Sequence, residues 1–93
     1  MPDKARADII RRLRAVDESL GCLYGLIEAG APCGQVLRQL CAIQAELQAL
    51  KIRMLNCQVS ASKSIIQFNP SADNRLAELQ RLFDLYNTLI QST

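Results

Sequence analysis

Apolar residues recur at alternating spacings of three and four along three stretches of the chain, which is typical of helices with one buried face. The spacing predicts helices over residues 4–29, 33–67 and 71–91. Gly30 provides a stop after the first helix, Pro32 starts the second, and Pro70 follows its end. Asp3 is the expected N-cap of the first helix. No linker divides the chain, so we expect an all-α fold in which residues 1–93 form a single helical domain.

The middle helix carries the longest apolar line, and that line has a cysteine at each end. Its members are Cys33, Val36, Leu40, Ile43, Leu47, Leu50, Met54 and Cys57. Such a line predicts the a/d seam of a helix that packs against another helix. At a rise of 1.5 Å per residue, the two thiols lie about 36 Å apart on one straight helix, so they cannot meet within one chain. The last helix has a similar apolar face, formed by Leu76, Leu79, Phe83, Tyr86 and Ile90.

Antiparallel pairing of the middle helix with a second copy would bring the thiols together. The layers between the two copies would be Cys33 with Cys57, Val36 with Met54, Leu40 with Leu50, and Ile43 with Leu47. Other registers and a parallel pair are also compatible with this periodicity. A second apolar line widens the apolar surface of the helix and favours an oligomer; its members are Leu37, Cys41, Ala45, Ile52, Leu55 and Val59.

Composition narrows the class of protein. Half of the 93 residues are apolar and 4% are aromatic, which suits helices packed through Leu, Ile and Ala. There is no apolar run of membrane-spanning length and no signal peptide, so we expect a cytoplasmic protein with no membrane partner. In a reducing compartment, four cysteines indicate free thiols, ligands or redox centres rather than structural disulfides. Cys22 and Cys41 are interpreted as core packing.

Three segments are similar to motifs of a known family. Residues 12–17 (RLRAVD) resemble its R-L-R-R-I-E, residues 27–33 (IEAGAPC) its I-E-x-G-x-x-C, and residues 36–47 its V-L-x-Q-L-x-A-V-x-A-A-L. Residues 9–62 thus resemble the CsoR/RcnR/FrmR family of small all-helical bacterial repressors, which sense copper, nickel or cobalt, persulfide or formaldehyde. The resemblance implies a three-helix protomer, an antiparallel four-helix-bundle dimer, a dimer of dimers, and release of operator DNA when an effector binds.

The sensor positions depart from the family pattern. The resemblance places the family's three metal ligands on Cys33, Gln58 and Ser62. An amide and a hydroxyl do not replace the imidazole and thiolate of the usual copper set, and the chain contains no histidine. The nickel and cobalt subclass loses its imidazoles too. A Cu(I) cofactor held by the two thiolates of Cys33 and Cys57 stays open, because Cu(I) accepts sulfur sets of low coordination number.

Two thiol chemistries also stay open. The first turn of a helix favours the thiolate form, which makes Cys33 the main sensor candidate. A persulfide or another oxidant would join Cys33 to Cys57 of a second copy. Alternatively, removal of Met1 would expose Pro2 as a secondary amine, which condenses with formaldehyde and is then bridged to Cys33. Formaldehyde-sensing members of the family resemble this chain in having Pro2.

Basic side chains supply candidates for contact with DNA phosphates, although a net charge of +2 is too small to indicate nucleic acid by itself. The candidates are Arg11, Arg12, Arg14, Arg38, Lys51 and Arg53. No helix-turn-helix, zinc or β-ribbon signature is present, so recognition would use a helical surface and DNA shape.

The resemblance implies a DNA-binding transcriptional repressor, a homodimer or homotetramer, and together with the cysteine positions it predicts control by an effector at a thiol site between subunits. No histidine, converging carboxylate pair or phosphate-binding glycine loop indicates an enzyme. The alternative is a helical metal-storage or adaptor protein that has lost DNA binding. The small net charge favours that alternative, as does Glu18-Ser19 in place of the family's G-Q.

Overall fold

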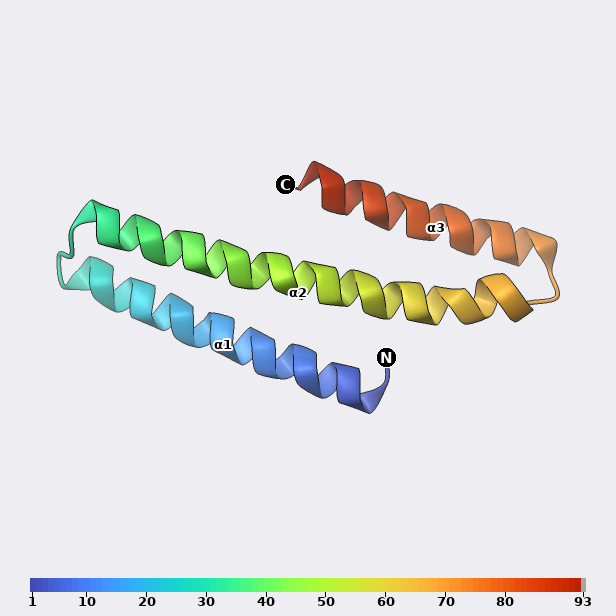
Figure 1. Ribbon diagram of the computed structural model, residues 1–93, viewed down its shortest axis with the longest axis horizontal. Helices are drawn as coiled ribbons and strands as arrows, with labels where there is room; N and C mark the ends of the chain where they lie inside the picture. The colour runs from blue at the N-terminus through green and yellow to red at the C-terminus, as the bar shows by residue number, and fades with distance from the viewer. Residues whose placement is uncertain (93) are drawn as a thin grey trace. The chain divides into compact units, whose positions relative to one another are not determined.

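The computed structural model describes residues 1–92, which form three α-helices (Figure 1). They are α1 (Asp3–Glu28), α2 (Cys33–Phe68) and α3 (Ala72–Gln91). Each helix begins and ends within one residue of its predicted bounds, and no strand occurs among the described residues. The predicted all-α, three-helix protomer is therefore confirmed. No helix in this part of the chain combines the length and the apolar character needed to cross a membrane.

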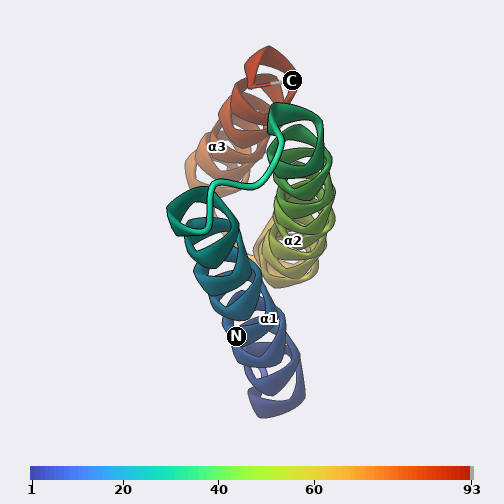
Figure 2. The ribbon, with the colours of Figure 1, turned by 90° about the vertical axis from the view of Figure 1, so that its left-hand side faces the viewer.

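The chain divides into two compact units. The first unit is Pro2–Leu50, in which α1 and the first part of α2 run antiparallel as a helical hairpin (Figures 1 and 2). The second unit comprises the residues from Lys51 onward, together with Met1, and its two helical segments are the rest of α2 and α3. Both units are small two-helix assemblies, so each has a thin core and a large surface.

The turn between α1 and α2 follows directly from its sequence. Gly30 adopts φ +72°, a left-handed conformation that glycine accepts without steric cost. The amide of Gly30 donates to the carbonyl of Ile27 at 3.1 Å, and that of Ala31 donates to Leu26 at 2.9 Å. These two bonds form a Schellman motif, which satisfies carbonyl groups at the end of α1. The predicted stop at Gly30 is confirmed.

The helix N-termini differ in how they are capped. The N-cap of α1 is Pro2, which forms no side-chain cap bond, so the prediction of Asp3 as N-cap is wrong by one position. Asp3 instead lies in the first turn, where a carboxylate interacts favourably with the helix dipole. The N-cap of α3 is Ser71, whose hydroxyl accepts a hydrogen bond from the amide of Asn74 at 3.3 Å.

The core of the first unit uses one half of the predicted seam. Ile9 and Val16 of α1 are buried, as are Ile43 and Leu50 of α2. Leu47, the other member of the central part of the seam, is 39% exposed. The buried and exposed members each repeat every seven residues, because α1 covers only one side of the seam.

This division distinguishes the two members of each predicted layer between α2 helices. The layer of Leu40 with Leu50 would join a residue that is 40% exposed to one that is 9% exposed. The layer of Ile43 with Leu47 would likewise join a buried residue to an exposed one. Ile43 and Leu50 already belong to the core of their own chain, whereas Leu40 and Leu47 are free to meet a second copy. The pairing of two α2 helices stays a prediction.

The second unit is packed less tightly. Its fully buried side chain is Ser62, and Glu78 is almost as well covered. Several apolar residues around them are half-buried, namely Leu55, Ile66, Leu82 and Leu89. The apolar face expected for α3 is exposed in the chain, and its members are Leu76, Leu79, Phe83, Tyr86 and Ile90. Because this face is exposed in the chain, it does not contribute to the core of the unit.

Two glycines within α1 offer a test of the exposed surface of the first unit. A Cβ added at Gly21 or Gly25 would meet nothing within 4 Å. Because glycine in a helix interior costs about 1 kcal/mol relative to alanine, we expect Gly21→Ala and Gly25→Ala each to raise the free energy of unfolding by about that amount. Urea denaturation measures the change. As a control, Gly30→Ala should lower it, because φ +72° is strained for alanine; a loss of stability at Gly21 or Gly25 would contradict an open surface there.

Candidate effector and DNA-binding sites

Cys33 is placed where a reactive thiol is expected. It is the first residue of α2 and it is exposed. The preceding carbonyl, that of Pro32, accepts hydrogen bonds from the amides of Gln35 and Val36 at 3.0 and 3.2 Å. No acidic residue lies in the first turn of α2, so no carboxylate opposes the positive end of the helix dipole. Cys33 is therefore a thiol at a helix N-terminus that solutes can reach.

The other predicted members of the effector site lie far from Cys33 within one chain. Pro2 and Cys33 stand at opposite ends of α1, a helix of 26 residues, which at 1.5 Å per residue is about 39 Å long. Cys57 lies on the same uninterrupted helix as Cys33. A covalent bridge from Cys33 to either residue would therefore have to join two copies of the chain.

The remaining cysteines differ from expectation. Cys22 and Cys41 are exposed in the chain, so their interpretation as core packing is wrong for the protomer. Two helices bury only the stripes that face each other, and these cysteines lie outside those stripes. Cys57 is half-buried. Cys33, Cys22 and Cys41 are thus the more accessible thiols.

Gln58 and Ser62 belong to a buried polar cluster in the second unit. The hydroxyl of Ser62 donates to Oε1 of Glu78 at 2.6 Å, and Nε2 of Gln58 donates to Oγ of Ser62 at 2.9 Å. Nη2 of Arg81 lies 3.7 Å from the same Oε1. Ser62 has no exposed surface, and Glu78 is 8% exposed. We call Gln58, Ser62 and Glu78 the polar triangle.

Sequence reasoning missed Glu78. The available signal was its position on the inner face of α3, three residues after Arg75 and four before Leu82, both of which are partly covered. A carboxylate at such a position is buried and needs a donor from a neighbouring element. The donor is Ser62, from α2.

The family-like metal positions do not fit the usual metal donors. Gln58 and Ser62 are neutral and already hydrogen-bonded to each other, and the chain has no histidine. Among residues 1–92, no group of three or more His, Cys, Asp and Glu side chains is placed to hold a metal ion. A hydroxyl and an amide are poor ligands for the softer transition metals, so the donor set at these positions does not fit such an ion.

Replacing Ser62 tests the energetic weight of the polar triangle. Ser62→Ala removes the hydroxyl that donates to the buried Glu78 carboxylate. We expect the free energy of unfolding to fall by about 1–3 kcal/mol, because a buried carboxylate loses a hydrogen bond that water does not replace. Urea denaturation measures this loss. The matched control is Ser60→Ala on the same helix, where the side chain is exposed and the change should stay below about 0.5 kcal/mol.

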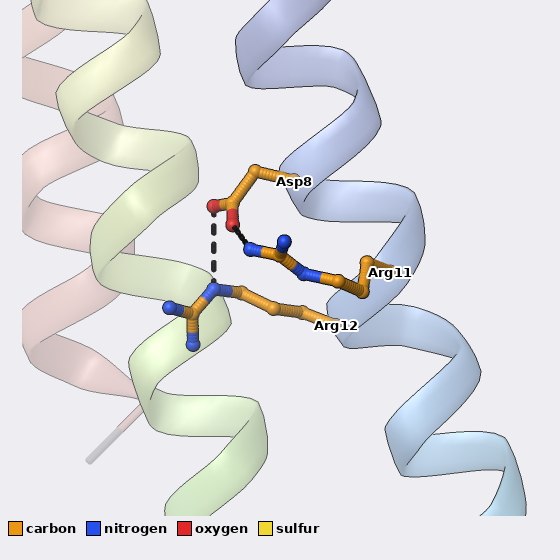
Figure 3. Close-up of polar contacts among 3 residues, drawn as sticks. All are labelled: Asp8, Arg11 and Arg12. Carbon is orange, nitrogen blue, oxygen red and sulfur yellow. Dashed lines mark hydrogen bonds and ion pairs between the residues drawn. The ribbon is translucent and has the colours of Figure 1, made fainter.

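The basic candidates on α1 are organised around one carboxylate. Figure 3 shows the side chains of Arg11 and Arg12 both reaching Asp8 on the same helix. Arg12 uses Nε, at 3.3 Å, so both of its terminal nitrogens point away from Asp8 (Figure 3). The side chain of Arg11 is 77% exposed, against 35% for Arg12. Asp8 thus orients two guanidinium groups while leaving donors for a further anion.

The other four candidates are divided between the units. Arg14 and Arg38 are exposed in the first unit. Lys51 and Arg53 belong to the second unit, where Nζ of Lys51 donates to Oγ of Ser92 at 3.2 Å. The structure therefore places Arg11, Arg12, Arg14 and Arg38 on one helical hairpin.

Ser19, at a position where the sequence departs from the family motif, has a structural role. Its hydroxyl donates to the Glu46 carboxylate, with distances of 3.0 and 3.3 Å to the two oxygens. Nε2 of Gln39 donates to the Ser19 carbonyl at 3.4 Å. These bonds connect α1 to α2 between partly covered side chains. The departure from the motif is accommodated as a link between the helices of the first unit.

Comparison with known proteins assigns the family. Residues 5–85 match the metal-sensitive transcriptional repressor family, and this range contains Cys33, the polar triangle and all the basic candidates. Neither the curated proteins nor the solved structures gave a significant match. Because the family match extends over most of the chain and all three helices, the protein belongs to the family of metal-sensitive transcriptional repressors.

Proposed function

We propose that the protein is a repressor that binds operator DNA as a dimer or tetramer and releases it when an effector modifies Cys33. The family match supports repression, DNA binding and oligomerisation. The observation that carries the choice of effector is the exposed thiol at the first residue of α2. The effector is then a small thiol-reactive electrophile rather than a transition metal bound by imidazole and thiolate.

A sulfane-sulfur donor fits this thiol. The Cys33 thiolate attacks a polysulfide, breaks one S–S bond and becomes a persulfide, and the shortened polysulfide leaves as an anion. The thiolate of Cys57 from a second copy then attacks the inner sulfur of that persulfide, which forms a disulfide and releases hydrosulfide. The persulfide forms first on Cys33 because Cys33 is exposed, whereas Cys57 is half-buried.

Formaldehyde is the second candidate effector. The amine of Pro2, after removal of Met1, would condense with formaldehyde to an iminium ion and release water. The Cys33 thiolate of another copy would then add to the iminium carbon and close an N–CH2–S bridge. Both steps conserve oxidation state, so reductant would not reverse them.

A gel shift with the promoter DNA of the protein's own operon separates these effectors. Protein and DNA are incubated with polysulfide, formaldehyde or Cu(I), and dithiothreitol is added afterwards. The protein is analysed on non-reducing gels and by mass spectrometry before and after this addition. Polysulfide is expected to release DNA reversibly and to give a Cys33–Cys57 dimer on non-reducing gels. Formaldehyde would leave a one-carbon bridge that dithiothreitol does not remove. Release by Cu(I) alone would instead identify the two-thiolate Cu(I) site of Cys33 and Cys57, and no release in any arm would contradict the proposal.

If arginine side chains bind DNA phosphates, their removal should weaken DNA binding and reduce its salt dependence. Replacing Arg12 and Arg14 by Ala should weaken binding to operator and unrelated DNA alike. The slope of log Kobs against log salt should fall by about 2, one unit for each lost phosphate contact. Fluorescence anisotropy at several salt concentrations measures both quantities. The double variant should keep its helical circular dichroism, which excludes unfolding as the cause.

Unchanged DNA affinity in that double variant would favour a metal-storage or adaptor protein. Two observations support this second candidate: the net charge is only +2, and Ser19 has a structural bond to Glu46 at a position where the family has a different residue. An adaptor would also leave the promoter DNA unbound at low salt.

A further inference from the structure

The polar triangle is the buried polar cluster of the second unit, and each of its hydrogen bonds has a definite direction. Gln58 donates to Ser62, and Ser62 donates to Glu78. The first bond lies within α2 and the second runs from α2 to α3, so the Ser62–Glu78 bond links the two helical segments of the unit. The Ser62 side chain is fully buried. Its hydroxyl oxygen accepts a hydrogen bond from Gln58, and its hydroxyl proton is donated to the Glu78 carboxylate.

The charge of Glu78 is also partly balanced. Nη2 of Arg81 stands 3.7 Å from the oxygen that accepts the Ser62 hydroxyl. An incoming cation would have to compete with Arg81 and displace the Ser62 proton from Glu78. It would gain one carboxylate together with two neutral oxygen donors, a set that holds borderline transition metals poorly.

We propose that the polar triangle is a metal-free latch: the Ser62–Glu78 hydrogen bond, supported by Gln58, holds α3 against α2 at the positions where the family pattern would put two metal ligands, and no transition metal binds there. This inference deepens the proposed function, since it says which class of effector the repressor does not use. Its test requires no DNA, so its failure and the failure of the repressor proposal are distinguishable.

The geometry also says what would convert the latch into a metal site. Positions 58 and 62 are one helical turn apart and share a face, as their hydrogen bond shows. Gln58→His and Ser62→Cys would supply an imidazole and a thiolate beside the Glu78 carboxylate, whose Oε1 lies 2.6 Å from the Ser62 oxygen. Nitrogen, sulfur and oxygen donors of this kind suit Zn²⁺ and Co²⁺, with water as a fourth ligand.

The experiment titrates Co²⁺ into the natural protein and into the Gln58→His/Ser62→Cys variant, and measures both affinities by competition with a chelating indicator. The thiolate-to-cobalt charge-transfer band then shows whether the introduced thiolate binds the ion in the variant. We expect the variant to bind Co²⁺ at least about 100-fold more tightly than the natural protein. Adding Glu78→Gln to the variant should remove most of that gain. A variant that folds but binds no more tightly than the natural protein would overturn the proposal.

A second measurement covers the case in which the double variant does not fold. The melting temperature of the natural protein is measured with and without excess Zn²⁺, and again for Glu78→Gln. We expect Zn²⁺ to shift the natural protein and Glu78→Gln equally. A Zn²⁺-dependent stabilisation that Glu78→Gln removes would show that the natural triangle does hold a metal, and would overturn the latch.

Discussion

Cys33→Ala is expected to keep operator DNA bound in the presence of polysulfide or formaldehyde at concentrations that release the natural protein completely. The physical reason is that both chemistries begin or end at this sulfur, and alanine offers no nucleophile. Binding without effector should be unchanged, because Cys33 is exposed and outside the core of the first unit. Gel shifts over a range of effector concentrations measure the effect.

Cys41→Ala is the matched control, because Cys41 is an exposed thiol on the same helix. It should respond like the natural protein. Cys57→Ala separates the two chemistries, since it should prevent the disulfide formed after polysulfide treatment and leave the formaldehyde response intact. Normal release of DNA by Cys33→Ala under every effector would show that this thiol is not the sensor.

The helices themselves were predictable because the signals that bound them act locally. Gly30 accepts the left-handed backbone that ends α1, and Pro32 and Pro70 restrict the residues around them. Such effects depend on a few neighbouring residues and survive in almost any tertiary setting. The error in the N-cap of α1 is also local. It amounts to a single residue, because Pro2 and Asp3 are both favoured near the start of a helix.

The assignment of faces was not predictable in the same way. Periodicity identifies which residues of α2 are apolar, and it treats Leu47 and Ile43 as equivalent members of one seam. The structure separates them, because α1 covers one side of the seam and leaves the other exposed. That choice depends on how two helices pack, which a spacing of three and four along one helix does not contain.

The polar triangle could not be predicted from the sequence for a related reason. Gln58 and Ser62 could be identified only as poor metal ligands, since their partner Glu78 lies on a different helix. A buried hydrogen bond between helices requires the register of one helix against the other. Cys33, in contrast, was identified from its position at a helix N-terminus, and the structure places it there in the open.

The division of the seam predicts opposite effects of the same substitution at two aliphatic residues that lie one helical turn apart on α2. Leu47 is 39% exposed and Ile43 is 4% exposed, although both are apolar members of the same line on α2. If the exposed half of the seam packs against a second copy, Leu47→Asp should give a folded monomer. A carboxylate in that interface costs desolvation free energy, which we expect to weaken the dimer by about 100-fold or more.

Ile43→Asp places the same charge inside the protomer instead, so it should unfold the chain at any protein concentration, with a loss of about 4 kcal/mol or more. Sedimentation velocity at micromolar concentration and circular dichroism together distinguish the two outcomes. The exposed Leu37→Asp should behave like Leu47→Asp, since it lies on the uncovered side of the same helix. A Leu47→Asp protein that remains a dimer would show that the copies do not meet through this face, and an unfolded one would show that Leu47 supports the protomer itself.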